Sequence, residues 1–210
     1  MAIKTIIFDM GGVIITIDNE EPKKRFTEMG VKNASELMNP YLQSGIFGDL
    51  EEGKISTEDF RVALSKICGR ELTFDEVKHC WLGYMKEVPR RNLEALLKLR
   101  QMGYRVILLS NTNGYATDWT DGDNWDGEGH PISYYFDAMY RSYEVKMMKP
   151  NENFFHYVLA QEQLMPEEAL FLDDGPRNVA AASQVGIRTY CPENGADWTQ
   201  PLFDLLQQES

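Results

Sequence analysis

The chain has 210 residues, which is enough for one sizeable hydrophobic core and a smaller appended unit. Hydrophobic residues make up 43% of the sequence and charged residues 26%, as in ordinary globular proteins. The net charge of -12 argues against partners such as nucleic acid or an anionic membrane surface, because both require basic surface on the protein. An acidic protein can still bind an anionic metabolite where its site concentrates cations.

The first apolar stretch is short and ends at Asp9, unlike a signal peptide, and no apolar run approaches membrane-spanning length. The cysteines at positions 68, 80 and 191 are odd in number and far apart. We therefore expect a reduced, cytoplasmic protein. As a separate expectation, the protein is a monomer or a weak homodimer.

Strand-like apolar runs lie at about residues 3–8, 104–109, 169–172 and 187–190, and helical patterns lie between them. This alternation predicts an α/β fold, a Rossmann-like parallel sheet with helices on both faces. The helices expected around this sheet cover approximately residues 89–102, 154–164, 176–186 and 198–207.

The segment between the first two predicted strands is far longer than a simple crossover needs. Helical patterns follow Ser56 and Thr73, and the second of these opens with a capping box. We predict a small helical cap domain over residues 18–88, inserted after the first strand, and an α/β core domain built from residues 1–17 and 89–210.

Polar residues follow the predicted strands directly. Asp9 ends the first run and precedes Gly11 and Gly12, and in open α/β sheets ligands bind at this edge. Taken alone, an acid before two glycines indicates only a turn. Ser110 and Asn111 follow the second run, where hydroxyl, amide and backbone N–H groups suit a phosphate, although an ordinary helix cap is the simpler interpretation.

Two further segments add charge. Lys149 precedes Pro150 at the expected start of a helix, where a lysine can hold a phosphoryl group, although most lysines are merely solvated. Asp173 and Asp174 follow the run at 169–172, and adjacent carboxylates repel each other unless a cation joins them. Carboxylate oxygens of this kind are typical of a Mg²⁺ site.

Together, the segments FDMGGVIITID, LLSNTN, MKP and FLDDGPRN resemble the haloacid-dehalogenase-like (HAD) hydrolase superfamily. The resemblance covers nearly the whole chain, including the order of the motifs and the cap between the first two. Within the superfamily, the motifs are most similar to those of the bacterial α-D-glucose-1-phosphate phosphatase group. The resemblance implies a Mg²⁺-dependent phosphatase that hydrolyses a small phosphorylated metabolite, such as a hexose 1-phosphate, through an aspartyl-phosphate intermediate.

The resemblance also implies a role for each motif residue. The nucleophile would be Asp9. The groups that hold Mg²⁺ would be Asp9, the backbone carbonyl of Gly11, Asp174 and, beside it, Asp173. The groups that bind the phosphoryl oxygens or offset their charge would be Gly12, Ser110, Asn111 and Lys149. Asn178 would orient the loop that follows the acidic pair.

Position 11 departs from the superfamily pattern. Most of its phosphatases carry a second aspartate two positions after the nucleophile as the general acid and base, and this chain has Gly11 there. Asp18 is the candidate replacement, and its other interpretation is a turn or helix-cap acid. Alternatively, the substrate needs little help, as a sugar 1-phosphate would, because an anomeric hydroxyl leaves readily.

Other functions remain open at this point. A 2-haloacid dehalogenase would use the same Asp9 on carbon and would not miss an acid at position 11, but it would not need the acidic pair. A phosphomutase would need the missing proton carrier. A catalytically weak protein that binds a phosphorylated metabolite is the alternative outside the enzymes.

The cap is expected to choose the substrate. Three basic side chains could add positive charge over the site, although a solvated helix face is the simpler interpretation: Lys23, Lys24 and Arg25. Three aromatic side chains could contact a sugar, although core packing is the simpler interpretation: Tyr41, Phe47 and Trp81.

Overall fold

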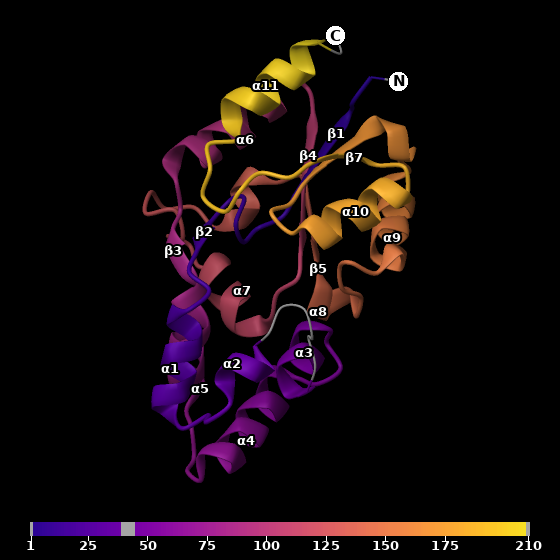
Figure 1. Ribbon diagram of the computed structural model, residues 1–210. Coiled ribbons are helices and arrows are strands. Elements are labelled where there is room, and N and C mark those ends of the chain that lie inside the picture. Colours follow the sequence, from indigo (N-terminus) through magenta and orange to yellow (C-terminus); the bar gives the residue numbers. More distant parts are fainter. Residues whose placement is uncertain (1, 39–44, 209–210) are drawn as a thin grey trace.

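The computed structural model describes residues 2–38 and 45–208 and has two parts, a sheet with helices around it and a helical bundle below it (Figure 1). Both ends of the chain lie at the far end of the sheet part, away from the bundle (Figure 1). Tyr41, one of the aromatic residues considered for substrate contact, lies outside the described residues.

The central sheet has five parallel strands in the order β5-β4-β1-β6-β7. The strands are β1 (Thr5–Phe8), β4 (Arg105–Ser110), β5 (Ala138–Arg141), β6 (Ala169–Leu172) and β7 (Arg188–Tyr190). The predicted parallel α/β fold is therefore confirmed. The strand β5 was missed, because it is a half-buried edge strand that lacks the continuous apolar run of the central strands.

Alternate residues of the central strands pack into two different hydrophobic cores. Ile6 and Phe8 of β1 face one core with the helices α6 (Arg90–Gln101) and α11 (Thr199–Gln208). Ile7 faces the other core with α9 (Glu152–Glu162) and α10 (Pro176–Gln184). Because both faces are covered, β1 is buried along its whole length. The remaining short elements of this part are α7 (Gly114–Thr120), η2 (Ile132–Tyr135), α8 (Ser142–Val145) and η3 (Pro166–Glu168).

The helical bundle has a hydrophobic core of its own. Its elements are α1 (Glu21–Met29), α2 (Ala34–Leu37), α3 (Gly45–Glu51), α4 (Thr57–Cys68), α5 (Phe74–Trp81) and η1 (Leu82–Tyr84). Phe47 lies at its centre, with edge-to-face contacts to Phe26 at 5.1 Å and to Phe60 at 5.0 Å between ring centroids. The expected capping box is present, because Thr73 and Glu76 exchange side-chain and backbone hydrogen bonds at the start of α5.

A short antiparallel ribbon of β2 (Thr16–Ile17) and β3 (Met85–Glu87) joins the bundle to the sheet part. The chain passes into the bundle and back out of it through this ribbon, next to the boundaries at residues 17/18 and 88/89. These boundaries remain a prediction, and the core of the bundle supports them, although Tyr115 of α7 in the sheet part also packs into it.

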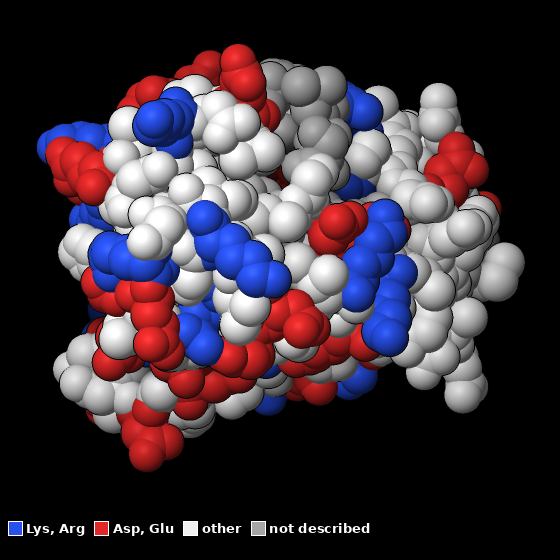
Figure 2. All heavy atoms as spheres, turned by 90° about the horizontal axis from the view of Figure 1, so that it is seen from below, with Lys and Arg blue, Asp and Glu red and all other residues white. Residues whose placement is uncertain are grey.

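Figure 2 views the molecule from the bundle end, where acidic and basic side chains are interspersed over the visible face. Exposed ion pairs of the bundle include Lys54 with Glu52 at 2.6 Å and Arg70 with Glu76 at 2.8 Å. Such exposed pairs contribute little to stability. In the described part of the chain, no helix combines the length and apolarity needed to span a membrane.

Candidate active site

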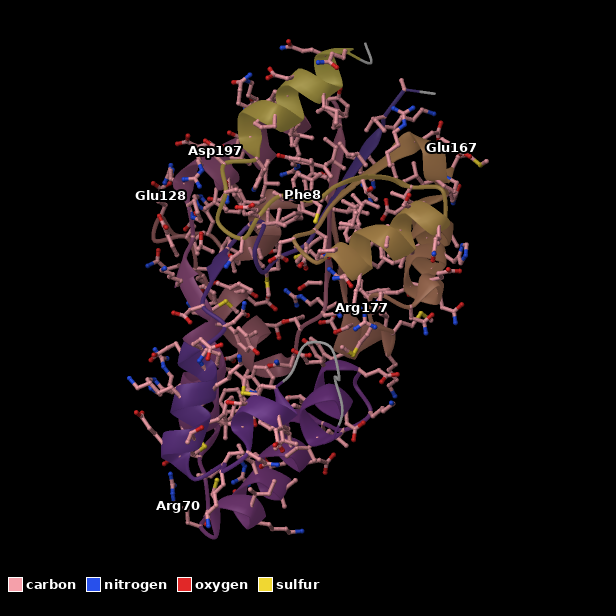
Figure 3. All side chains as sticks on the ribbon, in the orientation of Figure 1. Phe8, Arg70, Glu128, Glu167, Arg177 and Asp197 are labelled. Atoms are coloured by element: carbon pink, nitrogen blue, oxygen red, sulfur yellow. The ribbon has the colours of Figure 1, made fainter. Side chains whose placement is uncertain are left out.

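The polar residues predicted at the strand ends do meet at one edge of the sheet. The strand β1 lies between β4 and β6, and Phe8, its last residue, pairs in register with Leu108 and Leu172. Phe8 lies inside the sheet part (Figure 3), so the chain leaves the core at the residue that follows it. There, Asp9, Asp173 and Asp174 each place one carboxylate oxygen within 4.8 Å of the others.

Lys149 lies at the centre of this cluster. Its Nζ donates hydrogen bonds to the Leu109 carbonyl at 2.8 Å and to Asp173 Oδ2 at 2.7 Å, and it lies 2.8 Å from Asp9 Oδ1. Lys149 is 1% exposed, so these three contacts use all three ammonium donors in a water-poor setting. The lysine is thus fixed against the nucleophile candidate rather than solvated. The helix α9 begins at Glu152, which is two residues after Pro150 and two residues before the start of the predicted range 154–164.

Asp9 and Asp174 both have a raised pKa, because they are buried beside other carboxylates. Burial raises the pKa of Asp9 to about 7; Lys149 opposes the shift, while Asp173 and Asp174 add to it. Burial and the neighbouring Asp173 raise the pKa of Asp174 to about 6. Each shift reports first the cost of burying a carboxylate away from water and then the repulsion from its acidic neighbours. A divalent cation among these oxygens would remove this repulsion, so the donor set fits a hard metal ion.

Asp173 and Asp174 have different surroundings. Asp173 is fully buried and accepts hydrogen bonds from the Gly175 N–H at 2.7 Å and from Asn178 Nδ2 at 3.0 and 3.1 Å, in addition to Lys149. Asn178 therefore does contact the acidic pair. Asp174 lies against Gly12, where an added Cβ would come within 2.2 Å of its carboxyl group. Gly12 also has a φ of +82°, so glycine is required here both for its missing Cβ and for its backbone conformation.

At the end of β4, Asn111 is tied to the lysine. Its side chain donates to the Lys149 carbonyl at 2.8 Å and accepts from the Lys149 N–H at 2.9 Å. Ser110 is 1% exposed, and among the described residues its hydroxyl makes one long contact, of 3.3 Å, with the Asn111 carbonyl. Their proposed part in binding phosphoryl oxygens stays a prediction, and for Asn111 the side chain has a second role in holding Lys149.

Sequence reasoning missed two residues that hold the loop after Asp9. The Asn92 side chain donates to the carbonyls of Val13 at 2.9 Å and Ile14 at 3.1 Å, and the Trp198 indole N–H donates to the same Val13 carbonyl at 2.8 Å. Asn92 is 1% exposed and Trp198 is fully buried. A buried asparagine within the apolar face of a helix was the available signal for the first of them.

A cavity of about 570 Å³ opens between the sheet part and the bundle. The sheet part contributes Asp9, Lys149 and Asp174 to its lining, and the bundle contributes Glu51, Trp81 and Tyr84. Trp81 belongs to the bundle core as well, and its indole nitrogen is buried without a hydrogen-bond partner among the described residues. The bundle thus forms the part of the cavity wall that faces the carboxylate cluster.

Asp18, the predicted replacement for the missing acid, lies elsewhere. Its Oδ1 accepts the backbone N–H groups of Glu20 at 2.8 Å and Glu21 at 3.0 Å, which is the turn considered above, placed directly before α1. These hydrogen bonds lower its pKa, and the residue lines a second, shallower hollow with Lys24. The structure therefore does not bring Asp18 to the carboxylate cluster. Lys23 does line the main cavity and forms an ion pair with Glu20 at 2.6 Å.

The sequence pattern of the haloacid dehalogenase-like hydrolases matches residues 3–186 of this chain. The chain belongs to this family. Its HAD-like fold is shared with a predicted HAD-like hydrolase of Porphyromonas gingivalis, which has a TM-score of 0.94, 40% identity, and coverage of 99% of each chain.

Two further relatives of this HAD-like hydrolase come from Bacteroides thetaiotaomicron. One is named D-ribitol-5-phosphate phosphatase and is 42% identical over 97% of this chain and 98% of its own length. The other is a HAD family enzyme solved with magnesium and inorganic phosphate; its TM-score is 0.86 and its identity 33%, over 95% of this chain and 99% of that one. The resemblance that the motifs indicated is thereby confirmed at the level of the family.

Proposed function

We propose that this HAD-like hydrolase is a Mg²⁺-dependent phosphatase that hydrolyses a small phosphorylated metabolite through an aspartyl-phosphate intermediate. The observation that carries the proposal is the contact between Lys149 and Asp9 at 2.8 Å within a cluster of three carboxylates. The names of the relatives support it, since one is a phosphatase and another binds magnesium and phosphate.

In this proposal, Asp9 attacks phosphorus, and Lys149 favours its ionised form and offsets the charge that gathers on the phosphoryl oxygens. The residues that would hold the cation are Asp9, Asp174 and the Gly11 carbonyl, while Asp173 holds the lysine. When bound, the cation supplies positive charge against the phosphoryl oxygens. Unit charges about 4 Å apart interact by roughly 4 kcal/mol at an effective dielectric constant of about 20, so the uncompensated cluster should repel a phosphate dianion.

The identity of the organic group is a finer proposal. The motif resemblance favours a hexose 1-phosphate, whereas the relative at 42% identity is named for D-ribitol 5-phosphate. Both are polyhydroxylated phosphomonoesters. The cavity wall suits that class, because polar side chains such as Glu51 and Lys23 stand among the aromatic ones. We therefore propose a sugar or polyol phosphate as the substrate. A 2-haloacid dehalogenase would not need the acidic pair, so the carboxylate cluster favours the phosphatase.

The test compares the wild type with Asp9→Asn on a panel of sugar and polyol phosphates. Asparagine keeps the shape of the side chain but is a poor nucleophile, so phosphate release should vanish while the thermal unfolding curve keeps its cooperativity. EDTA should abolish turnover by the wild type and added Mg²⁺ should restore it. Full turnover in metal-free buffer, or by the Asp9→Asn variant, would refute the proposal.

A further inference from the structure

The proposed chemistry needs a proton for the oxygen that leaves phosphorus, and Gly11 cannot supply one. We propose that Glu51, on the cap helix α3, is the general acid and base of this site. The inference rests on the proposed phosphatase function and adds to it a catalytic residue from the other part of the molecule.

Glu51 shares the cavity with the nucleophile candidate. The acidic residues that line it, among those the structure describes, are Asp9, Asp174 and Glu51. The first two belong to the carboxylate cluster, which leaves Glu51 as the acid on the opposite wall, where the organic part of a substrate would lie.

A hydrogen-bonded bridge fixes the position of Glu51 relative to the strand ends. The Ser142 hydroxyl donates to the Glu51 carbonyl at 2.6 Å and accepts from the Thr112 N–H at 2.9 Å. Thr112 is the second residue after Ser110, the last residue of β4. The end of α3 is therefore tied to the same strand edge that carries the phosphoryl-binding candidates.

The bundle also touches the sheet part through its backbone beside Glu51. At Gly53, which has a φ of +71°, an added Cβ would lie 2.1 Å from the Tyr143 carbonyl oxygen. Only a glycine allows the two backbones to approach this closely. In Figure 1, α3 accordingly lies at the upper edge of the bundle, directly below α8. The end of α3 is thus packed directly against the sheet part beside the site.

The protonation state of Glu51 suits proton transfer. Burial raises the pKa of its carboxyl group to about 7, so near neutral pH both the acid and its conjugate base are populated. Within the described part of the chain, no cation or hydrogen-bond donor engages this carboxyl group.

The other proton donors in the lining are less suitable. Burial raises the pKa of the Tyr84 hydroxyl, and the nearby Glu51 raises it further. Lys23 forms an ion pair with Glu20, and Lys149 already donates to three oxygens.

The two half-reactions balance with one proton. In the first, an Asp9 oxygen forms a bond to phosphorus, the bond from phosphorus to the ester oxygen breaks, and that oxygen takes the proton of the Glu51 carboxyl group. In the second, the Glu51 carboxylate takes a proton from water as the water oxygen attacks phosphorus, and the bond from phosphorus to Asp9 breaks. Glu51 ends as it began, and the products are an alcohol and inorganic phosphate.

The experiment compares Glu51→Gln with the wild type on two kinds of phosphate ester, one with an alkyl leaving group and one with p-nitrophenolate. An alkoxide needs a proton in order to leave, whereas p-nitrophenolate leaves without one. We expect kcat/KM for the best alkyl substrate to fall about 100- to 10,000-fold, and kcat/KM for p-nitrophenyl phosphate to fall by less than about tenfold. The ratio of the two values in one sample does not depend on the fraction of folded protein.

Two control variants separate this role from others. Glu52→Gln removes the neighbouring acid, which pairs with Lys54, and should keep the wild-type ratio. Glu51→Asp retains an acid on a shorter side chain and should recover part of the alkyl turnover. Equal losses on both substrates, or no loss on either, would overturn the role of Glu51. The proposed phosphatase function would still stand in that case, provided that the wild type turns over both esters. A wild type inert on every ester would overturn the proposed function itself.

Discussion

The side-chain amide of Asn111 pairs with the backbone of Lys149 through two hydrogen bonds, one of 2.8 Å to its carbonyl and one of 2.9 Å from its N–H. This pair joins the end of β4 to the segment before α9, which are 38 positions apart in sequence. Since Lys149 Nζ is in turn bonded to Asp173 and contacts Asp9, the amide sets the place from which the lysine reaches both carboxylates.

We expect Asn111→Ala to lower kcat by about 10- to 100-fold, because a lysine displaced by as little as about 1 Å no longer lies against the nucleophile. The variant Ser56→Ala is a matched control for stability, since it removes a capping hydrogen bond of α4 and should cost about 1 kcal/mol without touching the site. Steady-state kinetics at saturating substrate, with urea unfolding of both variants, makes the comparison. Wild-type kcat in Asn111→Ala would show that the amide does not position the lysine.

The convergence of Asp9 with Asp173 and Asp174 could be predicted from the sequence because both segments follow buried apolar runs without a gap. Parallel central strands must end at one edge of the sheet, so the position of a residue that directly follows such a strand is largely fixed. The same reasoning could not resolve Asp18, since an aspartate that accepts two backbone N–H groups and one that faces a substrate look alike in sequence.

Contacts between distant segments could not be predicted from the sequence patterns, for a different reason. The bond from Ser142 to the Glu51 carbonyl joins residues 91 positions apart, and nothing in the periodicity of either segment reports it. The helix α3, which Glu51 ends, has seven residues, too few for the apolar periodicity that indicated α4 or for a pattern behind a capping box such as the one that indicated α5. The edge strand β5 escaped prediction because its half-buried side chains show no apolar run.

Gly12→Ala should weaken the response of the enzyme to Mg²⁺. The new methyl group would lie 2.2 Å from the carboxyl carbon of Asp174, so this carboxylate would have to move out of the cluster. We expect the Mg²⁺ concentration for half-maximal activity to rise by about tenfold or more, as is common when the support of a metal ligand is lost. A Mg²⁺ titration of activity measures this.

Gly103→Ala is the matched control for backbone strain. Gly103 has a φ of +91°, close to the +82° of Gly12, but an added Cβ there would meet nothing within 4 Å. Both variants should lose about 1 to 2 kcal/mol of unfolding free energy from the left-handed backbone, and only Gly12→Ala should change the Mg²⁺ titration. Identical titrations for the two variants would place Asp174 outside the metal site.

Glu51 should make the unfolding free energy depend on pH. Burial raises the pKa of its carboxyl group from 4.5 to about 7, so between these values the folded chain keeps a proton that the unfolded chain has released. The contribution of Glu51 to stability therefore falls as the pH rises through this window and is restored below it. Glutamine binds no proton in either state, and Glu51→Gln should gain stability relative to the wild type between pH 4.5 and pH 8, by at most about 3 kcal/mol.

Urea unfolding of the wild type and of Glu51→Gln at pH 4.5 and at pH 8, with EDTA present throughout, measures this gain in stability. The carboxylate cluster is common to both proteins, so its own titration cancels in the difference. Glu52→Gln, which also removes one negative charge beside Lys54, corrects for the general effect of net charge. A difference between Glu51→Gln and the wild type that stays constant across the window would mean that the Glu51 carboxyl group ionises as freely in the folded chain as in the unfolded one. That result would also deprive the proposed general acid of its proton near neutral pH, so the measurement bears on the mechanism without requiring knowledge of the substrate.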